Sequence, residues 1–474
     1  MSTGKALIWA SFNQFGVQII NFIVTLLLTR LLSPKEVGTI ALISILIAIG
    51  SMLINSGLTQ SLLRTPNINE NDYANIFYIN LIISVIIYLL VFFLSPIISS
   101  FYNLEILKNI IRVFSLTFIF NAICNVQITR LTVEMNFKMQ SLVTIPASFI
   151  SGLIGIFMAY KGFGVWSLVW SQVSNPFFIT IFLLYFTKWK PKFNFNIEII
   201  KKHWNFGYKL MLAGLIDSFF TNFYSSLIGK KFNLIEAGLF YRADTVKQLP
   251  LSNLTLILNK ILFPILTPLQ NDIEHFKEKS ILILKTIIFF VFPFFIFSSI
   301  FAEPIFKILF TVKWLGSVKY FQLLCFSALL YPVHIFNLTI LNIKGKSDKV
   351  FFLQIIKTII SVTLILIFIG FGVIGLMYGL IIESVLAFFL NSYFLKKIIN
   401  FGPIDQLKEM LPIILISLIY GVFTIYLNQI AIKINFNDFI RILICGLISL
   451  SFYYLLSIIF LKQILHNIKK LILN

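Results

Sequence analysis

Three ionisable side chains lie close together in the apolar segment GLFYRADTVKQLP, which covers residues 238–250. Arg242 and Asp244 are two residues apart, and Lys247 follows Asp244 by about one helical turn. An arginine guanidinium is planar and can donate two parallel hydrogen bonds to one phosphate, so the segment favours a phosphorylated ligand. A simpler interpretation stays open, in which Asp244 and Lys247 form an ion pair within their own helix.

Charged residues in other apolar segments are further candidates for a binding site, because a charge inside a membrane is costly. Asp217 lies in LAGLIDSFFTNFYSS, and Arg30 and Arg64 lie near the ends of predicted helices. Asp217 could instead pair with an arginine, and Arg30 and Arg64 could extend their charges to the membrane surface. Glu303 and Glu383 are candidates for a proton or sodium site. We therefore predict substrate binding by Arg30, Arg64, Asp217, Arg242, Asp244 and Lys247.

No pattern of catalytic residues accompanies these charges. The sequence has no HExxH, no nucleophile elbow, no paired carboxylates and no GxxxxGK[ST] loop. The four histidines are scattered, and the three cysteines lie in apolar runs without CxxC spacing. We predict a protein that is not an enzyme and that needs no metal or cofactor.

The composition indicates that the segments that carry these residues lie in a membrane. Of the 474 residues, 58% are hydrophobic and 12% are charged. Soluble domains are about 45–50% apolar and about 25% charged. A single soluble core could not bury this much apolar surface. The chain is therefore predicted to be an all-α polytopic membrane protein.

Apolar runs of roughly 20 residues, the length that crosses a bilayer, predict about fourteen transmembrane helices. Connections between them are short. The longest, KWKPKFNFNIEIIKKHW at 188–204, is predicted to be a surface loop or an interfacial helix. The predicted spans cover residues 7–29, 37–62, 75–98, 110–128, 141–160, 163–186, 207–229, 237–264, 282–302, 318–341, 350–370, 373–395, 410–430 and 438–461.

The net charge of +20 fits a membrane protein with basic cytoplasmic loops better than a nucleic-acid-binding protein. With the N-terminus in the cytoplasm, the cytoplasmic loops hold about twenty Lys and Arg and the external loops about ten. Both termini are then cytoplasmic, since the number of spans is even. We predict a multi-pass protein of the cell membrane that contacts lipid and binds no nucleic acid.

Two phrases of the sequence occur twice. GFGVWSLVW at residue 162 resembles GFGVIGLMY at 370, and TRLLSPKEVGTIAL at 29 resembles GKKFNLIEAGLFYR at 229. In the second pair Glu36 matches Glu236 and Gly38 matches Gly238, at an offset of 200 residues. The alternative is chance similarity between apolar segments, but the matching charged residues and glycines favour a duplication. The GFGV glycines are predicted to form a tight turn before the sixth helix of each half.

The duplication predicts two lobes of six helices, related by a pseudo-twofold axis along the membrane normal, as in transporters that work by alternating access. Two additional helices follow. The predicted organisation is an N-terminal lobe at 1–187, a cytoplasmic inter-lobe loop at 188–206, a C-terminal lobe at 207–400 and the additional helices at 401–474.

Six segments also resemble a known family. The chain resembles the Wzx-type lipopolysaccharide and exopolysaccharide flippases, in particular the colanic-acid and teichuronic-acid exporter branch. That family belongs to a superfamily that also includes the MATE drug exporters and the lipid II flippases. The similarity extends over residues 1 to about 400 and is carried by NSGLTQSLLR (55–64), TRLTVEMNFK (129–138), GFGVWSLVWSQ (162–172), GLFYRADTVKQLP (238–250), NKILFPIL (259–266) and FAEPIFKILFTVKW (301–314).

The resemblance implies a MATE-like fold and transport of an undecaprenyl-pyrophosphate-linked oligosaccharide to the outer leaflet, for assembly of O-antigen, capsule or exopolysaccharide. It further implies a cationic central cavity and a polysaccharide polymerase as downstream partner. On this sequence Arg64 and Arg242 match positions expected to bind the pyrophosphate, with Arg30 third. FTVKW departs from the family's usual glycine before the Lys–Trp pair, and residues beyond Lys397 carry little resemblance.

Two other functions stay open from the sequence. A cation-coupled multidrug exporter of the same fold would need an acidic residue in an otherwise neutral cleft, whereas the predicted cleft helices are rich in Arg and Lys. A membrane oligosaccharide polymerase would normally have a large external loop, and no predicted external loop here exceeds about twenty residues. We therefore favour the flippase.

Overall fold

The computed structural model describes residues 3–55, 57–65, 68–192, 194–462 and 464–466. All regular secondary structure in this part is helical, which confirms the all-α prediction. The chain divides into two compact units, Met1–Gly238 and Leu239–Asn474. Each unit is described on its own. The predicted lobes at 1–187 and 207–400 are defined by the sequence repeat and not by this division, so their boundaries stay a prediction.

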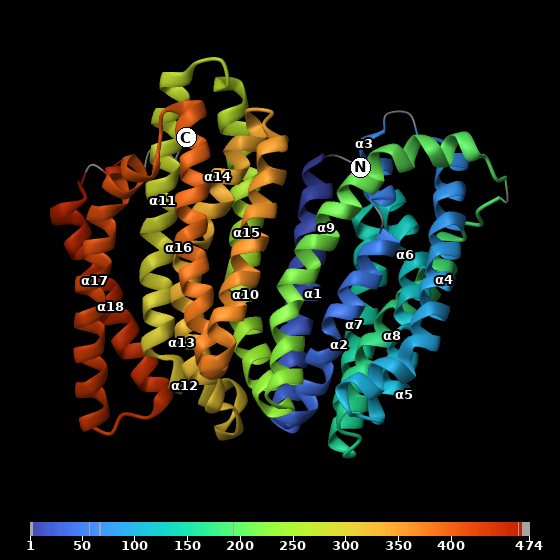
Figure 1. The fold of residues 1–474 in the computed structure, drawn as a ribbon, viewed down its shortest axis with the longest axis horizontal. Coiled ribbons are helices and arrows are strands. Elements are labelled where there is room, and N and C mark those ends of the chain that lie inside the picture. Colours follow the sequence, from blue (N-terminus) through green and yellow to red (C-terminus); the bar gives the residue numbers. More distant parts are fainter. Residues whose placement is uncertain (1–2, 56, 66–67, 193, 463, 467–474) are drawn as a thin grey trace. The chain divides into compact units, whose positions relative to one another are not determined.

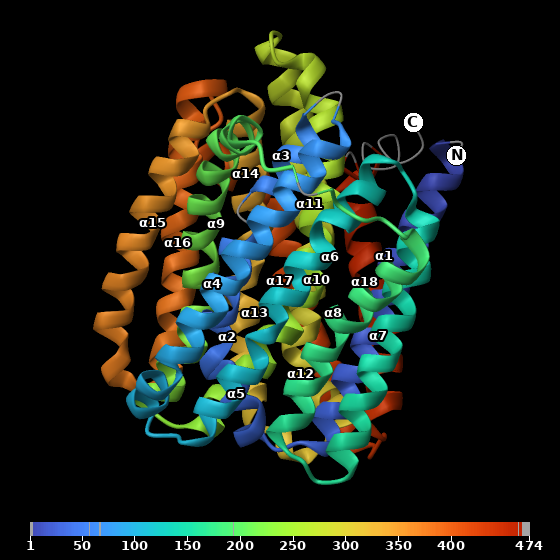
Figure 2. The same cartoon turned by 90° about the vertical axis from the view of Figure 1, so that its right-hand side faces the viewer.

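The long helices of the first unit run side by side, and α9 packs along α2 while its beginning contacts α3 and α4 (Figures 1 and 2). The helix α1 packs on α7, and α7 packs on α8. The helices of this unit are α1 (Thr3–Leu31), α2 (Pro34–Asn55), α3 (Leu58–Arg64), α4 (Glu70–Tyr102), α5 (Ile106–Phe114), α6 (Leu116–Val133), α7 (Phe137–Tyr160), α8 (Val165–Thr187) and α9 (Ile197–Lys231).

In the second unit α11 packs against α17 and α13, and α15 and α16 form a hairpin that is visible in both ribbon views (Figures 1 and 2). Short 3-10 turns cover Thr267–Leu269, Val312–Trp314 and Ile369–Phe371. The helices are α10 (Leu234–Leu266), which starts in the first unit, α11 (Ile273–Ile300), α12 (Ala302–Phe310), α13 (Gly316–Leu329), α14 (Tyr331–Ile343), α15 (Ser347–Phe368), α16 (Gly372–Ile399), α17 (Pro403–Lys433) and α18 (Asp438–Phe460).

The described residues contain 12 helical stretches that are long and apolar enough to cross a membrane. One of them, Ser347–Ile399, has 53 residues and contains both α15 and α16, which correspond to two predicted spans. The predicted span at 207–229 lies in α9, which is long enough at 35 residues but is not among the twelve. These helices are in rough agreement with the prediction of about fourteen.

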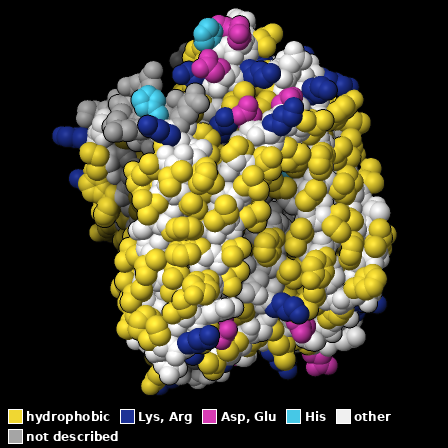
Figure 3. Space-filling view, turned by 90° about the vertical axis from the view of Figure 1, so that its left-hand side faces the viewer, with side chains coloured by type: hydrophobic (Ala, Val, Ile, Leu, Met, Phe, Trp, Pro, Cys, Tyr) yellow, Lys and Arg dark blue, Asp and Glu magenta, His cyan; other side chains and the backbone are white. Residues whose placement is uncertain are grey.

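The surface of these helices is that of a protein embedded in lipid. Large apolar side chains are strongly exposed along them, for example Leu366 at 71%, Val422 at 69% and Ile459 at 68%. Figure 3 shows hydrophobic side chains over the middle of one face, with Lys, Arg, Asp and Glu gathered toward its two ends. An apolar layer between two charged layers matches a bilayer and its aqueous boundaries.

The two GFGV phrases form turns before α8 and α16, as predicted. Gly162 and Gly164 have φ of 80° and 57°, and α8 begins at Val165. Gly372 has φ of 77° at the beginning of α16. Backbone with positive φ strongly favours glycine, which explains why both phrases place glycine there.

The second matched pair of the repeat brings α2 and the first turn of α10 into backbone contact. A Cβ atom added to Gly38 would lie 1.8 Å from the carbonyl oxygen of Leu234, and one added to Gly238 would lie 1.9 Å from that of Pro34. Residues 34 and 38 match residues 234 and 238, so the contact is reciprocal. The matched glycines thus allow the same close backbone approach on both sides of this contact, while the duplication itself stays a prediction.

The predicted span at 37–62 is two helices rather than one. The helix α2 ends at Asn55, Gly57 has φ of 65°, and α3 occupies Leu58–Arg64. The left-handed conformation of Gly57 ends the helical path, since it cannot continue a right-handed helix. The NSGLTQSLLR motif therefore contains the helix break and the short helix that carries Arg64 at its end.

Candidate functional site

Arg242 occupies an almost fully buried position on α10, where it is only 4% exposed. Its guanidinium carbon lies 5.5 Å from the ring centroid of Phe310 and 5.5 Å from that of Trp314. A cation near the face of an aromatic ring is stabilised by the ring quadrupole, more strongly when it is shielded from water. The two rings therefore give the guanidinium of Arg242 a buried, largely apolar environment.

The rings come from the FAEPIFKILFTVKW segment, which changes direction sharply between them. Phe310 is the last residue of α12, and Trp314 ends the 3-10 turn that follows. Between them Thr311 has φ of 77° and ψ of 172°, a conformation that glycine adopts far more readily than threonine. Thr311 lies in the FTVKW segment, and its β-branched side chain is strained in this conformation.

The charge of Arg242 is not neutralised within the described part of the chain. No carboxylate oxygen there lies within ion-pair distance of it, and its Nε atom is buried without a hydrogen-bond partner. Arg130 and Arg441, by contrast, form ion pairs with Glu70 and Asp438. A buried donor without a partner is costly, so Arg242 is well suited to an anionic ligand.

Asp244 and Lys247 form an ion pair one turn further along α10. The Nζ atom of Lys247 lies 2.5 Å from Oδ1 of Asp244, at i,i+3 spacing. This is the simpler interpretation of the GLFYRADTVKQLP spacing. The charges of the two side chains neutralise each other. Their assignment as substrate contacts stays a prediction.

Arg30 and Arg64 are both exposed and lie in the last turns of α1 and α3, where the helix dipole favours a positive charge. They flank opposite ends of α2, whose 22 residues span about 30 Å. The structure therefore does not bring these two arginines together. Asp217 lies in α9, but its side chain is outside the described residues. The binding roles of all three stay predictions.

The two acidic candidates for a proton or sodium site are separate from each other in the second unit. Glu383 accepts a hydrogen bond of 3.1 Å from Ser361, and Glu303 lies in the first turn of α12. Over the described residues, no group of three or more His, Cys, Asp or Glu side chains is arranged to hold a metal ion.

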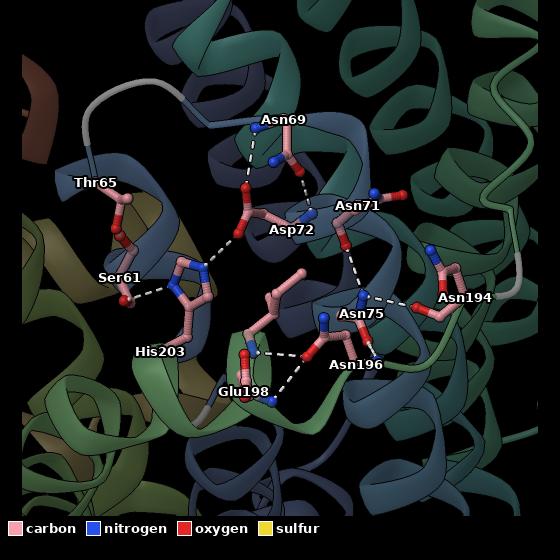
Figure 4. Close-up of polar contacts among 11 residues, drawn as sticks. Ser61, Thr65, Asn69, Asn71, Asp72, Asn75, Asn194, Asn196, Glu198 and His203 are labelled. Atoms are coloured by element: carbon pink, nitrogen blue, oxygen red, sulfur yellow. Dashed lines mark hydrogen bonds and ion pairs between the residues drawn. The ribbon is translucent and has the colours of Figure 1, made fainter.

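A polar cluster in the first unit was not predicted from the sequence. His203, which is fully buried, lies between Ser61 of α3 and Asp72 of α4 (Figure 4). Nearby, a cavity of about 180 Å³ is lined in part by Arg130, Glu134 and Trp189. No pattern in the sequence indicated His203, because its partners are more than a hundred residues away in sequence.

Comparison with known proteins identifies the family. Residues 27–319, more than half of the chain, match the family described as polysaccharide biosynthesis protein. The chain belongs to this family. The match includes Arg30, Arg64 and Arg242.

Curated relatives cover most of the chain at low identity. An uncharacterized membrane protein of the cps region of Klebsiella pneumoniae is 23% identical over 91% of each chain. The teichuronic acid biosynthesis protein TuaB of Bacillus subtilis (strain 168) is 21% identical over 73% of this chain and 72% of its own length. The lipopolysaccharide biosynthesis protein WzxC of Escherichia coli (strain K12) is 22% identical over 78% and 76%.

Solved structures with the same fold are transporters. The lipid II flippase MurJ, in an inward closed conformation, has a TM-score of 0.72 at 16% identity and covers 97% of this chain and 100% of its own. An inward-facing multidrug resistance MATE transporter has a TM-score of 0.65 at 16% identity and covers 83% and 98%. These similarities confirm the predicted MATE-like fold.

Proposed function

We propose that this chain is a flippase that moves a lipid-linked oligosaccharide across the cell membrane for polysaccharide assembly, by alternating access. It is a multi-pass membrane protein of the polysaccharide biosynthesis family, and its fold is that of transporters. The names of its relatives, which include a succinoglycan biosynthesis transport protein of Rhizobium meliloti (strain 1021), support the same function. It is a transporter and not an enzyme, so the polymerase alternative is excluded.

The observation that carries the substrate class is the buried Arg242, which forms no ion pair with a carboxylate among the described residues. Its position close to two aromatic rings, without a carboxylate within reach among the described residues, suits an anion that enters an apolar environment. A lipid-linked pyrophosphate brings phosphate oxygens to an apolar layer, and arginine binds them through two parallel hydrogen bonds. We infer undecaprenyl pyrophosphate as the carrier, with Arg64 and Arg30 as further contacts at other stages of transport.

The multidrug alternative rests on the fold alone. A carrier of cationic drugs would need an acidic side chain available to the substrate, whereas Asp244 is already paired with Lys247. The basic residues of α10 favour an anionic substrate instead. We further propose that both termini are cytoplasmic, that the product enters O-antigen, capsule or exopolysaccharide, and that a polysaccharide polymerase receives it.

The test uses a strain that lacks the gene and has no redundant flippase. A membrane-impermeant sugar label on intact spheroplasts measures how much undecaprenyl-linked glycan faces outward. The deletion should abolish external labelling, and the wild-type gene should restore it. Arg242→Ala should lower labelling at least about tenfold, because hydrogen bonds to charged groups contribute about 1.5–3 kcal/mol.

Arg112→Ala is the matched control. The Arg112 guanidinium lies 4.1 Å from the Phe92 ring centroid and donates from Nε to Ser95 at 3.0 Å, so it resembles Arg242 but has a polar partner. It should restore most of the labelling. Normal external labelling in the deletion strain would refute the flippase proposal, and full activity of Arg242→Ala would refute only the site.

A further inference from the structure

The connector, residues 188–206, is bound in its described part to the first three turns of α4 by specific polar contacts. Tyr78 donates to the carbonyl oxygen of Pro191 at 3.0 Å. Asn75 donates to the carbonyl oxygen of Asn194 at 2.9 Å and accepts from the backbone N–H of Asn196 at 2.7 Å (Figure 4). A free loop would satisfy these backbone groups with water, so α4 serves as a dock for the connector.

His203 closes this dock from the helical end of the connector. Its Nε2 atom lies 3.3 Å from Oδ1 of Asp72, and its Nδ1 atom lies 2.8 Å from Oγ of Ser61. One turn later Gly207 touches Gly57, where an added Cβ atom would lie 2.3 Å from the carbonyl oxygen of Gly207. The imidazole therefore links α9 to both α3 and α4 at a point of close backbone contact.

The partners of the imidazole define the tautomer of its neutral form in the docked connector. An ionised Asp72 only accepts hydrogen bonds, so Nε2 carries the hydrogen that faces it. In the neutral ring Nδ1 is then the acceptor, and the hydroxyl of Ser61 donates to it. Asp72 is held in place by the capping box at the beginning of α4, where its Oδ2 atom accepts from the backbone of Asn69 at 3.0 Å.

Among the described side chains, the charged groups with an influence on the ring are Asp72 of α4 and Lys202 of α9 itself. The helix α3 provides Ser61 and ends at Arg64, whereas the charges of α2, Lys35 and Glu36, lie at its far end. Burial is the strongest influence and lowers the pKa of His203, and the hydrogen bond from the ring to Asp72 opposes it.

We propose that Ser61, His203 and Asp72 form a proton-binding site that controls whether the connector stays docked on α3 and α4. Arg64, one of the arginines predicted to bind substrate, lies one turn beyond Ser61 on the short helix that the imidazole holds. Proton uptake at His203 would thus release α3 together with the connector. This consequence for transport rests on the proposed function, whereas the proton site itself does not.

The direction of the pH response follows from the lowered pKa of His203. The docked state favours the neutral ring, and the released state exposes an ordinary histidine with a pKa of about 6.5. Docking therefore has its full stability above about pH 6.5 and loses it as the pH falls, until the docked ring itself takes up a proton. Acidification releases the connector.

Hydrogen–deuterium exchange of the purified full chain tests this, with the backbone N–H of Asn196 as reporter, because it is bonded to Asn75 only while the connector is docked. After correction for the intrinsic rate, exchange at residues 194–200 should rise below about pH 6.5, by at most about tenfold per pH unit. His203→Gln should remove this pH dependence. Exchange that does not respond to pH in the wild-type protein would overturn the proposal.

Two further variants separate proton binding from a structural role. Asp72→Asn removes the counter-charge of the imidazolium. The rise in exchange on acidification should therefore extend over a wider pH range and reach a larger final value than in the wild type. A purely structural cluster would raise exchange equally at every pH, and this result in Asp72→Asn would overturn the proposal even if His203→Gln did not fold. His275→Gln is the control, because His275 also pairs with an aspartate, Asp272, but is exposed. It should keep the wild-type response.

Hydrogen–deuterium exchange is measured without substrate, so its result does not depend on whether the protein is a flippase. A normal pH response in a protein without flippase activity would overturn the proposed function alone. A flippase without a pH response would overturn the proton site alone.

Discussion

At the scale of single residues, the backbone of Thr311 is strained, and a substitution at this position could relieve the strain. Its φ of 77° and ψ of 172° belong to a region that glycine occupies almost alone, and its hydroxyl is buried without a partner. Thr311→Gly should therefore stabilise the purified protein by about 1 kcal/mol, since relief of about 1–3 kcal/mol is partly offset by the entropy of glycine. Thermal unfolding in detergent measures the change.

Thr311→Ala is the control for this prediction, because it removes the unpaired hydroxyl and keeps the Cβ atom that causes the strain. It should stabilise the protein less than Thr311→Gly does. Equal stabilisation by both variants would mean that the hydroxyl, and not the backbone conformation, is the source of the strain.

The sequence predicted the local parts of the candidate site and missed the distant ones. The i,i+3 spacing of Asp244 and Lys247 on one helix was enough to suggest their ion pair. The rings close to Arg242 come from residues about seventy positions later, so no local pattern could place them there. His203 looked like a scattered histidine for the same reason.

At the scale of helices, the crossing of α2 with the first turn of α10 depends on two glycines. The Cβ atom of alanine at position 38 would lie 1.8 Å from a backbone carbonyl oxygen, which no side-chain movement can relieve. Gly38→Ala should therefore destabilise the protein by at least about 3 kcal/mol, the upper range for overpacking. Thermal unfolding should show the loss, together with reduced yield of folded protein.

The matched glycine provides a second measurement of the same contact. Gly238→Ala should destabilise as strongly as Gly38→Ala, and the double variant by less than the sum, because one separation of the helices accommodates both methyl groups. Gly370→Ala is the control, since nothing lies within 4 Å of its added Cβ atom, and it should be nearly neutral. Additive effects in the double variant would contradict a shared contact.

Helix positions followed from the sequence far better than helix breaks did. Long apolar runs identify spans because a bilayer demands about 20 apolar residues. The break at Gly57 was missed because the polar residues of NSGLTQSLLR were interpreted as part of one helix, although α2 and α3 are separate. The GFGV turns were predicted because their glycines repeat, which the single glycine of this motif does not.

At the scale of the whole molecule, the number of crossings decides on which side of the membrane each turn lies. All three native cysteines are buried, so a cysteine introduced at an exposed turn should be the main site of labelling by a membrane-impermeant maleimide. Lys161, Lys192 and Asn435 are exposed in the α7–α8 turn, the connector and the α17–α18 turn. Each is replaced by cysteine in a separate variant and labelled in intact cells.

With fourteen crossings and a cytoplasmic N-terminus, Lys161→Cys lies outside, Lys192→Cys inside and Asn435→Cys outside. Seven crossings then separate the connector from the α17–α18 turn. If α9 did not cross the membrane, six crossings would separate the connector from the α17–α18 turn. The Lys192 and Asn435 variants would then be labelled from the same side. Labelling of Lys161→Cys and Asn435→Cys but not Lys192→Cys would support α9 as a span. It would also place the proton site of His203 on the cytoplasmic side. Labelling of Lys192→Cys alone would invert the proposed orientation, and the connector would then respond to external pH.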